Sequence, residues 1–550
     1  MLTLEKISSD TFAGRPGPLL LIVMDGVGIG KQDGSNAVYV AKTPTLDKLF
    51  GAKLYCQLQA HGQAVGLPSD DDMGNSEIGH NALGAGRVFD QGAKLVNKAI
   101  ETASMFDGEV WKKAVAAAKD GHTMHFIGLH SDGNVHSNIS QLYPMLKRAA
   151  EEGVKRCRVH ILLDGRDVPA KSALVYIEKT EKVLAEINEK YSADFRIASG
   201  GGRMITTMDR YQADWSIVER GWKAHVLGEG RAFNSAAEAV QTMYDEDAEA
   251  TDQYLKPFVI TENGKPVGTI ENGDSVVFFN FRGDRAIEIS MAFDGGAEFD
   301  KFDRIRVPEV YYSGIMEYDG DLKIPKHYLV NPPQIDRTFC EYLCDEGVKM
   351  FAISETQKFG HVTYFWNGNK SGYINEAMET YHEIPSDKIE FDKAPKMKAV
   401  EITDWVIDAL NSGQYKFGRL NLANGDMVGH TGNMDAAVIA VETVDECVGR
   451  MLEVVKKLNG IAIVTADHGN CDIMWTEKNG VRSPKTAHTL NPVPFCIYDP
   501  NYNGEYEMSA AATDTVNRPG LSNVAATVMN LLGFKAPEDY RPSLIEFKKN

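Results

Sequence analysis

The sequence predicts a doubly wound α/β fold that is organised as two domains. The first observation is a rhythm along the chain, in which short apolar runs alternate with longer amphipathic segments. The second is the length, because 550 residues exceed what one hydrophobic core usually holds. The third is an uneven distribution of chemistry. Aspartate and histidine residues of the kind that bind metals cluster towards both ends of the chain, whereas the middle carries arginine-rich loops.

Each short apolar run is expected to form a buried strand, because it is too short for a typical helix and is bounded by turn residues. The expected strands are 19–24, 123–129, 158–163, 275–280, 349–353, 418–423 and 461–466. The longer segments between them carry the apolar spacing of amphipathic helices. The clearest expected helices are 138–151, 172–190, 435–458 and 521–532.

One stretch, 234–273, departs from this rhythm. It contains the acidic run Asp-Glu-Asp-Ala-Glu and two Glu-Asn-Gly turn signals. Acidic runs favour solvent, and Asn-Gly is typical of a tight turn between strands. The sequence therefore predicts a solvated excursion that includes a hairpin.

The distribution of metal-type residues also predicts the domain organisation. If the two ends of the chain share one metal site, the middle must be an inserted domain. We place the boundaries near Arg87 and near 318–323. The prediction is a discontinuous metal-binding domain of 1–87 and 320–550, with an inserted domain of 88–319.

Charge and cysteine content narrow the class of protein. A formal net charge of -19 argues against a chain that coats nucleic acid or an anionic membrane. An anionic small-molecule substrate stays open, because a local arginine cluster can dominate the field inside a cleft. Seven cysteines, an odd count without a CxxC pair, are typical of reduced thiols in a cytoplasmic protein.

The N-terminal residues lack the pattern of a signal peptide, and the apolar run 19–24 is too short to span a bilayer. We therefore expect a soluble, cytoplasmic protein that binds neither nucleic acid nor membrane. We further expect a monomer that acts on a small molecule.

An Asp-His pair follows the last expected strand, as Asp467 and His468. A strand that delivers such a pair at its carboxyl end holds an oxygen and an imidazole ligand where open α/β sheets place their chemistry. Asp426 and His430 are spaced one helical turn apart, as a shared metal requires if the backbone there is helical. His488 lies downstream. Together these residues predict a two-metal site, although either of His430 and His488 alone would be interpreted as a buried core residue.

Two further candidates lie near the N-terminus. Asp25 ends the first expected strand with a glycine behind it, so its carboxylate can face a cleft, although Asp-Gly at a strand end is more often a turn. Ser76 lies where a glycine turn leads into a helix, a geometry that exposes a nucleophilic oxygen. The alternative interpretation of Ser76 is a helix N-cap.

Six motifs, taken in series over essentially the whole chain, resemble the cofactor-independent phosphoglycerate mutases. They are Val-Met-Asp-Gly at 23–26, Met-Gly-Asn-Ser-Glu-Ile-Gly-His at 73–80, His-Ser-Asp-Gly-Asn-Val-His-Ser at 130–137, Asp-Gly-Arg-Asp at 164–167, Phe-Arg-Gly-Asp-Arg at 281–285 and Thr-Ala-Asp-His-Gly-Asn at 465–470. The continuation at 81–87 is similar to the plant-like branch of that family.

This resemblance implies an alkaline-phosphatase-like α/β/α metal-binding domain with an inserted α/β phosphotransferase domain. It also implies two divalent metal ions. One would be held by Asp426, His430 and His488, and the other by Asp25, Ser76, Asp467 and His468. Mixed carboxylate, imidazole and hydroxyl ligands suit manganese, cobalt or zinc, and we expect manganese.

The activity implied by the resemblance is the interconversion of 3-phosphoglycerate and 2-phosphoglycerate in glycolysis and gluconeogenesis, without bisphosphoglycerate. Ser76 would accept the phosphoryl group, because metal coordination favours its alkoxide. Lys358 would neutralise charge on that group. Asp167 would exchange protons with the glycerate hydroxyls, and His136 would bind substrate.

A substrate with a carboxylate and a phosphate also needs several forked donors. The candidates in the middle of the chain are Arg166, Arg203, Arg210, Arg282 and Arg285. The three glycines before Arg203 lack the ending of a P-loop, so we interpret them as a flexible arm that presents this arginine.

The alternative function is a metal-dependent phosphatase that passes the phosphoserine to water. A phosphopentomutase fits less well, since threonine is expected at its nucleophile. A binding protein without activity is the third possibility, and the complete set of ligands argues against it.

Overall fold

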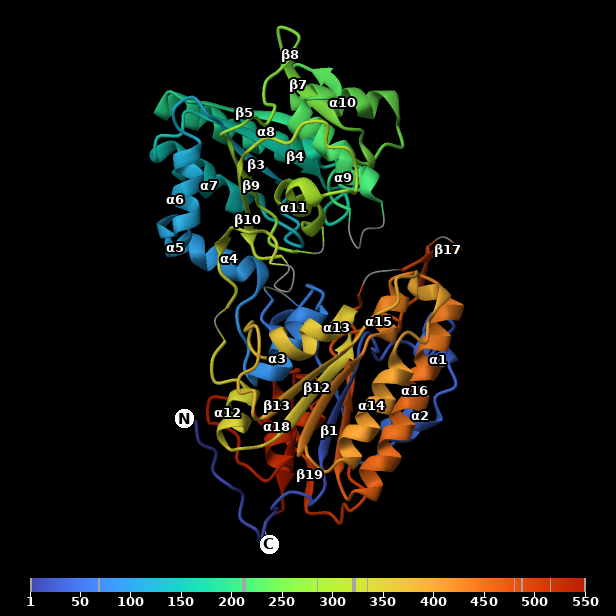
Figure 1. Ribbon diagram of the computed structural model, residues 1–550. Helices are drawn as coiled ribbons and strands as arrows, with labels where there is room; N and C mark the ends of the chain where they lie inside the picture. Colours follow the sequence, from blue (N-terminus) through green and yellow to red (C-terminus); the bar gives the residue numbers. More distant parts are fainter. Residues whose placement is uncertain are drawn as a thin grey trace. The chain divides into compact units, whose positions relative to one another are not determined.

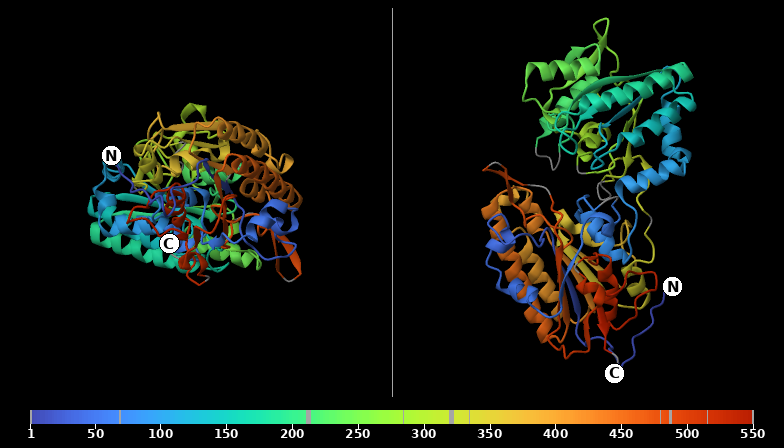
Figure 2. Two further views of the ribbon diagram at one scale, coloured as in Figure 1. Left: turned by 90° about the horizontal axis from the view of Figure 1, so that it is seen from below. Right: turned by 180° about the vertical axis from the view of Figure 1, so that it is seen from behind.

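The computed structural model describes residues 2–67, 70–209, 214–283, 285–318, 323–333, 335–478, 480–485, 488–514 and 516–548. The chain divides into two compact units, one formed by Met1–Gln91 with Pro333–Asn550 and the other by Gly92–Pro332. Figure 1 shows the helices and strands of both units, and Figure 2 shows them from two further directions. Each unit is built on a largely parallel sheet, so the predicted α/β fold class is confirmed.

The described residues of the first unit form a seven-stranded sheet. Its order is β13 (Glu379–Ile384), β12 (Met350–Glu355), β14 (Phe417–Leu422), β1 (Leu19–Met24), β15 (Ile461–Thr465), β18 (Val493–Tyr498) and β2 (Tyr55–Leu58). β1 runs parallel to both neighbours, and Ile22 lies opposite Leu420 and Val464. Every residue of β1 is buried, as its uninterrupted apolar run requires in a sheet that is covered on both faces.

Helices cover both faces of this sheet (Figure 1). The helices on one face include α14 (Ala399–Asn411) and α16 (Met434–Lys457), and those on the other include α3 (Ser76–Ala85), α12 (Phe339–Asp345) and α18 (Asn523–Leu531). The shorter elements are α1 (Ala37–Val40), α2 (Pro44–Phe50), η1 (Gly62–Val65), α13 (Thr356–Gly360), η5 (His361–Phe365), η6 (Phe391–Lys393), α15 (Asn424–Gly429), β16 (Trp475–Lys478), β17 (Val481–Pro484), β19 (Tyr506–Met508), α17 (Ala510–Thr513) and β20 (Ile545–Phe547).

The second unit contains a sheet with the order β11 (Tyr328–Val330), β10 (Tyr311–Met316), β9 (Ser275–Phe278), β3 (Met124–Leu129), β4 (Arg156–Leu163), β5 (Asp194–Gly202), β7 (Phe258–Glu262) and β6 (Arg231–Phe233), with β8 (Lys265–Pro266) paired to β7. Its helices are α4 (Gly92–Glu101), α5 (Ser104–Asp107), α6 (Glu109–Ala117), α7 (Ile139–Glu151), α8 (Ala173–Tyr191), α9 (Trp215–Trp222), η2 (Lys223–Leu227), α10 (Ala236–Glu246), η3 (Asp252–Tyr254), α11 (Ile287–Asp294) and η4 (Gly296–Glu298). The parallel order of β9, β3, β4 and β5 brings their carboxyl ends to one edge of the sheet.

The seven expected strands and the four expected helices all form, and their ends agree with the prediction to within two residues. All seven cysteines are buried and carry free thiols. No helix in the described part of the chain combines the length and the apolar character that a membrane crossing requires.

The prediction of a solvated excursion at 234–273 is wrong in part. The hairpin exists, because β7 and β8 pair across the Asn-Gly turn. However, α10 buries Val240 and Met243 in the core, and β7 joins the main sheet between β5 and β6 with Phe258 fully buried. The acidic run in this stretch lies next to apolar residues that pack inward, so composition alone was misleading.

Candidate active site

The carboxyl ends of four neighbouring strands of the first unit supply the candidate residues. Asp25 directly follows β1, Asp426 lies on α15 just after β14, Asp467 and His468 follow β15, and Lys358 lies on α13 after β12. The loops after β1 and β14 are in contact. Gly26 has a φ of +77°, and a Cβ at this position would lie 2.5 Å from the amide nitrogen of Asp426. Parallel pairing therefore brings these side chains to one place, as is general for open α/β sheets.

The first ligand group consists of Asp426, His430 and His488. The Nε2 atoms of both histidines lie 3.1 Å from Asp426 Oδ1 and 3.1 Å from each other. The amide of His430 donates to the carbonyl of Asp426 at 2.9 Å, so the predicted helical spacing of this pair is confirmed.

The protonation of His488 suits a metal ligand. Its Nδ1–H donates to the carbonyl oxygen of Gly74 at 2.8 Å, which leaves the lone pair of Nε2 directed at Asp426. Burial, together with the nearby charge of His468, lowers the pKa of His488 to about 3, so this imidazole is neutral. A lone pair that faces a carboxylate oxygen is satisfied by a cation between them.

The second group consists of Asp25, Ser76, Asp467 and His468. Ser76 Oγ lies 3.3 Å from both carboxylate oxygens of Asp25 and 2.9 Å from His468 Nε2. His468 Nδ1 contacts the carbonyl oxygen of Gly469 at 3.2 Å, so Nε2 again faces the site. Asp467 Oδ2 is buried, and its neighbour His80 Nδ1 lies 3.4 Å away while the same nitrogen lies 2.8 Å from the carbonyl oxygen of Ser76. A buried carboxylate oxygen with so distant a partner fits a metal ligand.

The two groups adjoin through His468. Ligand atoms of Asp426, His468 and His488 all lie within 4.8 Å of one another, and so do those of Asp25, Asp467 and His468. His468 Nε2 is 3.3 Å from Asp25 Oδ1 and 3.8 Å from Asp426 Oδ1. The arrangement can hold cations on both sides of this imidazole.

Lys358 lies in the middle of the carboxylates. Its Nζ is 2.5 Å from Ser76 Oγ, 2.8 Å from Asp426 Oδ2 and 3.1 Å from Asp25 Oδ2. Burial would lower the pKa of Lys358, but the carboxylates of Asp25, Asp426 and Asp467 outweigh burial and raise it above its usual value. The lysine is therefore charged.

The charge balance of the site calls for more cations than Lys358 provides. Three carboxylates are buried here, on Asp25, Asp426 and Asp467, and buried charges are stable only when they are paired. The same carboxylates overcome burial and raise the pKa of His468 to about 10. The donor set and its charge both fit divalent metal ions.

In the second unit, three predicted residues lie together. Arg203 Nη1 donates to Asp164 Oδ1 at 2.8 Å and also to Asp167 Oδ2. The amide of Arg166 donates to the same Asp164 oxygen at 3.2 Å, and its side chain is exposed. Arg203 is 1% exposed, so the expectation that a flexible arm presents it is wrong. The glycines before it belong to β5, where a Cβ on Gly200 would come within 2.5 Å of Phe258. Close packing explains these glycines.

Two other loops of the second unit hold His136, between β3 and α7, and Arg282 with Arg285, between β9 and α11. The carbonyl of His136 accepts from the amides of Phe281 at 2.8 Å and Arg282 at 3.4 Å. Arg285 is buried, and its Nη1 donates to the carbonyl oxygen of Met208 at 2.6 Å. Arg210 lies outside the described residues.

Comparison with known proteins places the chain in a family. A model of the metalloenzyme superfamily matches residues 17–536. A 2,3-bisphosphoglycerate-independent phosphoglycerate mutase from Trypanosoma brucei brucei is 55% identical over 540 residues, which cover 96% of this chain and 97% of that protein. The chain belongs to the 2,3-bisphosphoglycerate-independent phosphoglycerate mutases.

Other members of the mutase family show the same full-length similarity. A mutase of this name from Ricinus communis is 50% identical over 546 residues, with 97% of each chain covered. The crystal structure of Leishmania mexicana phosphoglycerate mutase at low cobalt concentration matches with a TM-score of 0.77 at 50% identity, and covers 100% of both chains. The resemblance inferred from six motifs is confirmed. Membership of a metalloenzyme superfamily, together with the two ligand groups, supports the binding of divalent metal ions.

Sequence reasoning missed three residues that contact the predicted ligands and the predicted nucleophile. Asn421 Nδ2 donates to Asp25 Oδ2 at 2.7 Å, and Asn470 Nδ2 donates to Asp426 Oδ1 at 2.9 Å. His80 Nδ1 lies 2.8 Å from the carbonyl oxygen of Ser76. A signal was present for each, because His80 and Asn470 fall inside the mutase motifs and Asn421 is a polar residue within an apolar strand.

Proposed function

We propose that the protein interconverts 3-phosphoglycerate and 2-phosphoglycerate through a phosphoserine at Ser76, without 2,3-bisphosphoglycerate. The observation that carries this proposal is the surroundings of Ser76 Oγ. A buried lysine, a carboxylate and an imidazole all lie within 3.3 Å of this hydroxyl, in a site whose charge calls for divalent cations. A hydroxyl in such surroundings is activated as a nucleophile.

We infer that two divalent metal ions act at this site, most favourably manganese, with cobalt or zinc as alternatives. Asp426, His430 and His488 would hold one, and Asp25, Ser76, Asp467 and His468 the other. When bound, such ions favour the ionised serine and neutralise the phosphoryl oxygens.

The chain's own groups then account for the transfer. Lys358 donates to Ser76 Oγ, which stabilises negative charge on that oxygen before attack and on the phosphoryl group during transfer. The α3 helix begins at Ser76, so the nucleophile lies on a rigid element, and the Asn75 side chain caps this helix through the amide of Ile78.

The second unit supplies groups for the glycerate. Arg203 orients the carboxylate of Asp167, which we propose as the base that exchanges protons with the two glycerate hydroxyls. Further substrate contacts are proposed for His136, Arg166, Arg203, Arg210, Arg282, Arg285 and Lys358. Forked guanidinium donors suit both the carboxylate and the phosphate of the substrate.

We also propose that the protein serves glycolysis and gluconeogenesis in the cytoplasm and acts as a monomer. The free thiols of all seven cysteines support a reducing compartment.

The test is an assay of purified, metal-loaded protein with 3-phosphoglycerate and no bisphosphoglycerate, in which 2-phosphoglycerate and inorganic phosphate are measured together. Conversion to 2-phosphoglycerate without release of phosphate is expected. A strict requirement for bisphosphoglycerate contradicts the proposal, and free phosphate as the main product identifies a phosphatase instead.

A further inference from the structure

A continuous chain of buried polar side chains crosses the sheet of the second unit. It joins Asp274 Oδ2 to His125 Nε2 at 3.1 Å, His125 Nδ1 to His160 Nε2 at 2.9 Å, His160 Nδ1 to Ser199 Oγ at 2.6 Å, Ser199 Oγ to His225 Nδ1 at 2.7 Å, and His225 Nε2 to Thr207 Oγ1 at 2.9 Å. All six side chains are at most 3% exposed. Buried polar groups in this number are costly unless every one is satisfied, and the chain satisfies them in sequence.

The strand register brings these side chains into line. His160 on β4 lies opposite Ser199 on β5 in the pairing of these two strands. The register shifts between Val159 and His160, where Ile197 is the partner before the shift and Ser199 the partner after it. A bulge re-aims side chains, and here it places the serine hydroxyl against the imidazole.

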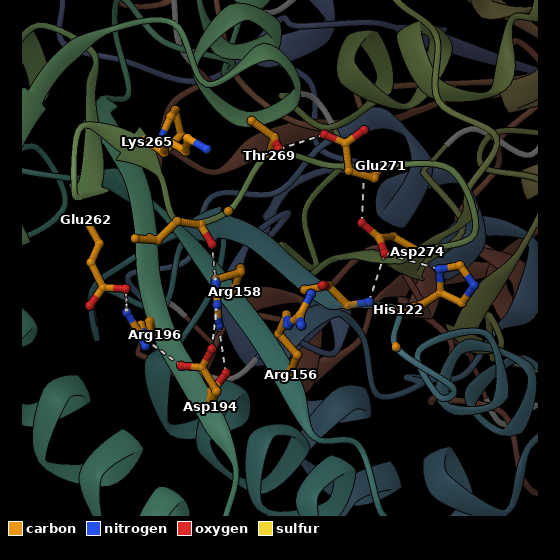
Figure 3. A pocket seen from close by; sticks show the side chains of 15 residues that line it. His122, Arg156, Arg158, Asp194, Arg196, Glu262, Lys265, Thr269, Glu271 and Asp274 are labelled. Atoms are coloured by element: carbon orange, nitrogen blue, oxygen red, sulfur yellow. Dashed lines mark hydrogen bonds and ion pairs between the residues drawn. The ribbon is translucent and has the colours of Figure 1, made fainter.

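One end of this hydrogen-bonded chain of side chains is the carboxylate of Asp274, which is held in a fixed position. Asp274 accepts hydrogen bonds from the amides of Thr123 and Glu271, each at 2.8 Å. Figure 3 shows Asp274 beside His122 and Glu271 in the wall of a polar cavity of about 480 Å³. Burial opposes ionisation of Asp274, but the hydrogen bond from His125 helps to hold its pKa below the usual value. The carboxylate is therefore ionised and can only accept.

That carboxylate fixes the direction of every hydrogen bond in the chain. His125 must donate from Nε2, so its Nδ1 accepts from the Nε2–H of His160. The Nδ1 of His160 then accepts from the hydroxyl of Ser199.

The Ser199 oxygen in turn accepts from the Nδ1–H of His225, and the Nε2 of His225 accepts from the hydroxyl of Thr207. All five bonds are satisfied with the three histidines neutral. Burial supports this state, because it lowers the pKa of His125 and of His160 and brings that of His225 to about 3.

The other end of the chain lies beside a predicted substrate residue. Thr207 has a φ of +71°, a conformation that a β-branched residue adopts only when its surroundings impose it. Its amide donates to the carbonyl of Ile217 at 2.7 Å, and its hydroxyl donates into the chain. The next residue, Met208, provides the carbonyl oxygen that accepts from Arg285 Nη1 at 2.6 Å.

We propose that Asp274, His125, His160, Ser199 and His225 are positioning residues that hold Thr207 in place and thereby set the location of the Arg285 guanidinium. This inference rests on the proposed function, in which Arg285 contacts phosphoglycerate. These positioning residues act through the backbone geometry of Thr207 and Met208 and make no contact with the substrate. Its loss is expected to weaken substrate binding more than it slows the chemical step.

The test compares two substitutions at the end of the chain in the full-length, metal-loaded protein. Thr207→Val deletes the hydroxyl and keeps the branched shape, and we expect KM for 3-phosphoglycerate to rise by about fivefold with kcat within about twofold of wild type, the effect of one buried hydrogen bond. Thr207→Ser keeps the hydroxyl and should keep KM near the wild-type value. Equal KM values for Thr207→Val and wild type would overturn the inference.

A matched control separates positioning from simple loss of stability. Tyr312 is a buried residue on β10 whose hydroxyl bonds to Ser290 Oγ, which also donates to the carbonyl of Ala286. Tyr312→Phe removes a buried hydrogen bond of the same unit outside the chain, so its melting temperature should fall while its KM stays unchanged. A KM increase in Tyr312→Phe equal to that in Thr207→Val would show a general effect of destabilisation and contradict the inference.

A second variant tests the remote end. Asp274→Asn keeps one acceptor oxygen but turns the other into an NH2 donor, so the side chain can no longer accept from Thr123, Glu271 and His125 together. We expect this variant to raise KM in the same direction as Thr207→Val. An unchanged KM in this variant, at full metal loading, would refute the role of the carboxylate. The wild-type assay is run first. Absence of mutase activity in wild type contradicts the proposed function, whereas normal wild-type activity with unaltered KM in both variants contradicts this inference alone.

Discussion

Lys358 Nζ lies 2.5 Å from Ser76 Oγ, although Ser76 lies on α3 and Lys358 lies on α13, 282 residues further along the sequence. The same ammonium group contacts the carboxylates of Asp25 and Asp426. One buried cation thus touches the proposed nucleophile and one carboxylate of each proposed metal site. This contact would link the charge of the proposed metal ligands to the reactivity of the proposed nucleophile.

We predict that Lys358→Gln lowers kcat by about 100-fold or more, because the developing charge on the phosphoryl group loses a fixed donor. Steady-state kinetics with 3-phosphoglycerate at saturating metal is the measurement. Lys370→Gln is the control, since Lys370 pairs with Glu341 at the surface of the same unit. If Lys358→Gln keeps wild-type kcat, the lysine has no part in the transfer.

Asn421 is predicted to act on metal affinity. Its amide fixes Asp25 through a 2.7 Å hydrogen bond, and the loss of such a partner typically weakens metal binding about 10–100-fold. After chelation, activity should return in wild type at low manganese and in Asn421→Ala only at higher manganese. Asn530→Ala, which removes a hydrogen bond to the Phe534 carbonyl and touches none of the proposed ligands through it, should titrate like wild type. Identical titrations for all three proteins would refute this role.

Asp167→Asn should separate proton transfer from binding. The amide cannot take a proton from glycerate, so kcat is expected to fall by about 100-fold or more. Arg203 keeps its contact with Asp164, so KM should change little. Single-turnover and steady-state kinetics distinguish the outcomes. A raised KM with unchanged kcat would make Asp167 a binding residue only.

Acid should destabilise the second unit at a pH where carboxylates are still ionised. Burial lowers the pKa of His130 and His225 to about 3 from an ordinary value of 6.5. As the pH falls below the unfolded value, only the unfolded chain takes up these protons. The free energy of unfolding should therefore decrease by up to about 1.4 kcal/mol per pH unit for each histidine.

Calorimetry of the metal-loaded protein at about pH 7 and about pH 5 measures this effect. His225→Gln should lose less stability than wild type over that interval. A melting temperature of wild type that is independent of pH in this range would contradict the prediction.

The sequence was sufficient to place those site residues that directly follow an expected strand. Asp467 and His468 could be assigned to the site because an apolar run directly precedes them, and the residues that follow parallel strands lie together at the carboxyl ends of those strands. The same reasoning placed Asp25, and it placed Asp426 with His430 through helical spacing. Their mutual distances, however, depend on the order of strands in the sheet, which the pattern alone does not give.

Other features escaped because they depend on contacts between distant segments. In the sequence, Asn421 is one polar residue within an expected strand. Its hydrogen bond to Asp25 becomes evident only when β14 pairs with β1. The chain of buried polar side chains from Asp274 to Thr207 depends on a register shift between β4 and β5. The glycines before Arg203 were interpreted as flexible, whereas close approach to Phe258 explains them.

The most direct test of the account is to look for the phosphoryl group on Ser76 itself. Metal-loaded protein is mixed with 3-phosphoglycerate, quenched in acid during turnover, digested and analysed by mass spectrometry. Ser76→Ala is treated in parallel, and so is Ser509→Ala, which replaces another buried serine of the same unit, the N-cap of α17. The account predicts phosphate on the peptide that contains Ser76 in wild type and Ser509→Ala, and neither label nor turnover in Ser76→Ala. Normal turnover by Ser76→Ala, or turnover of wild type with no phosphate on that peptide, would contradict it.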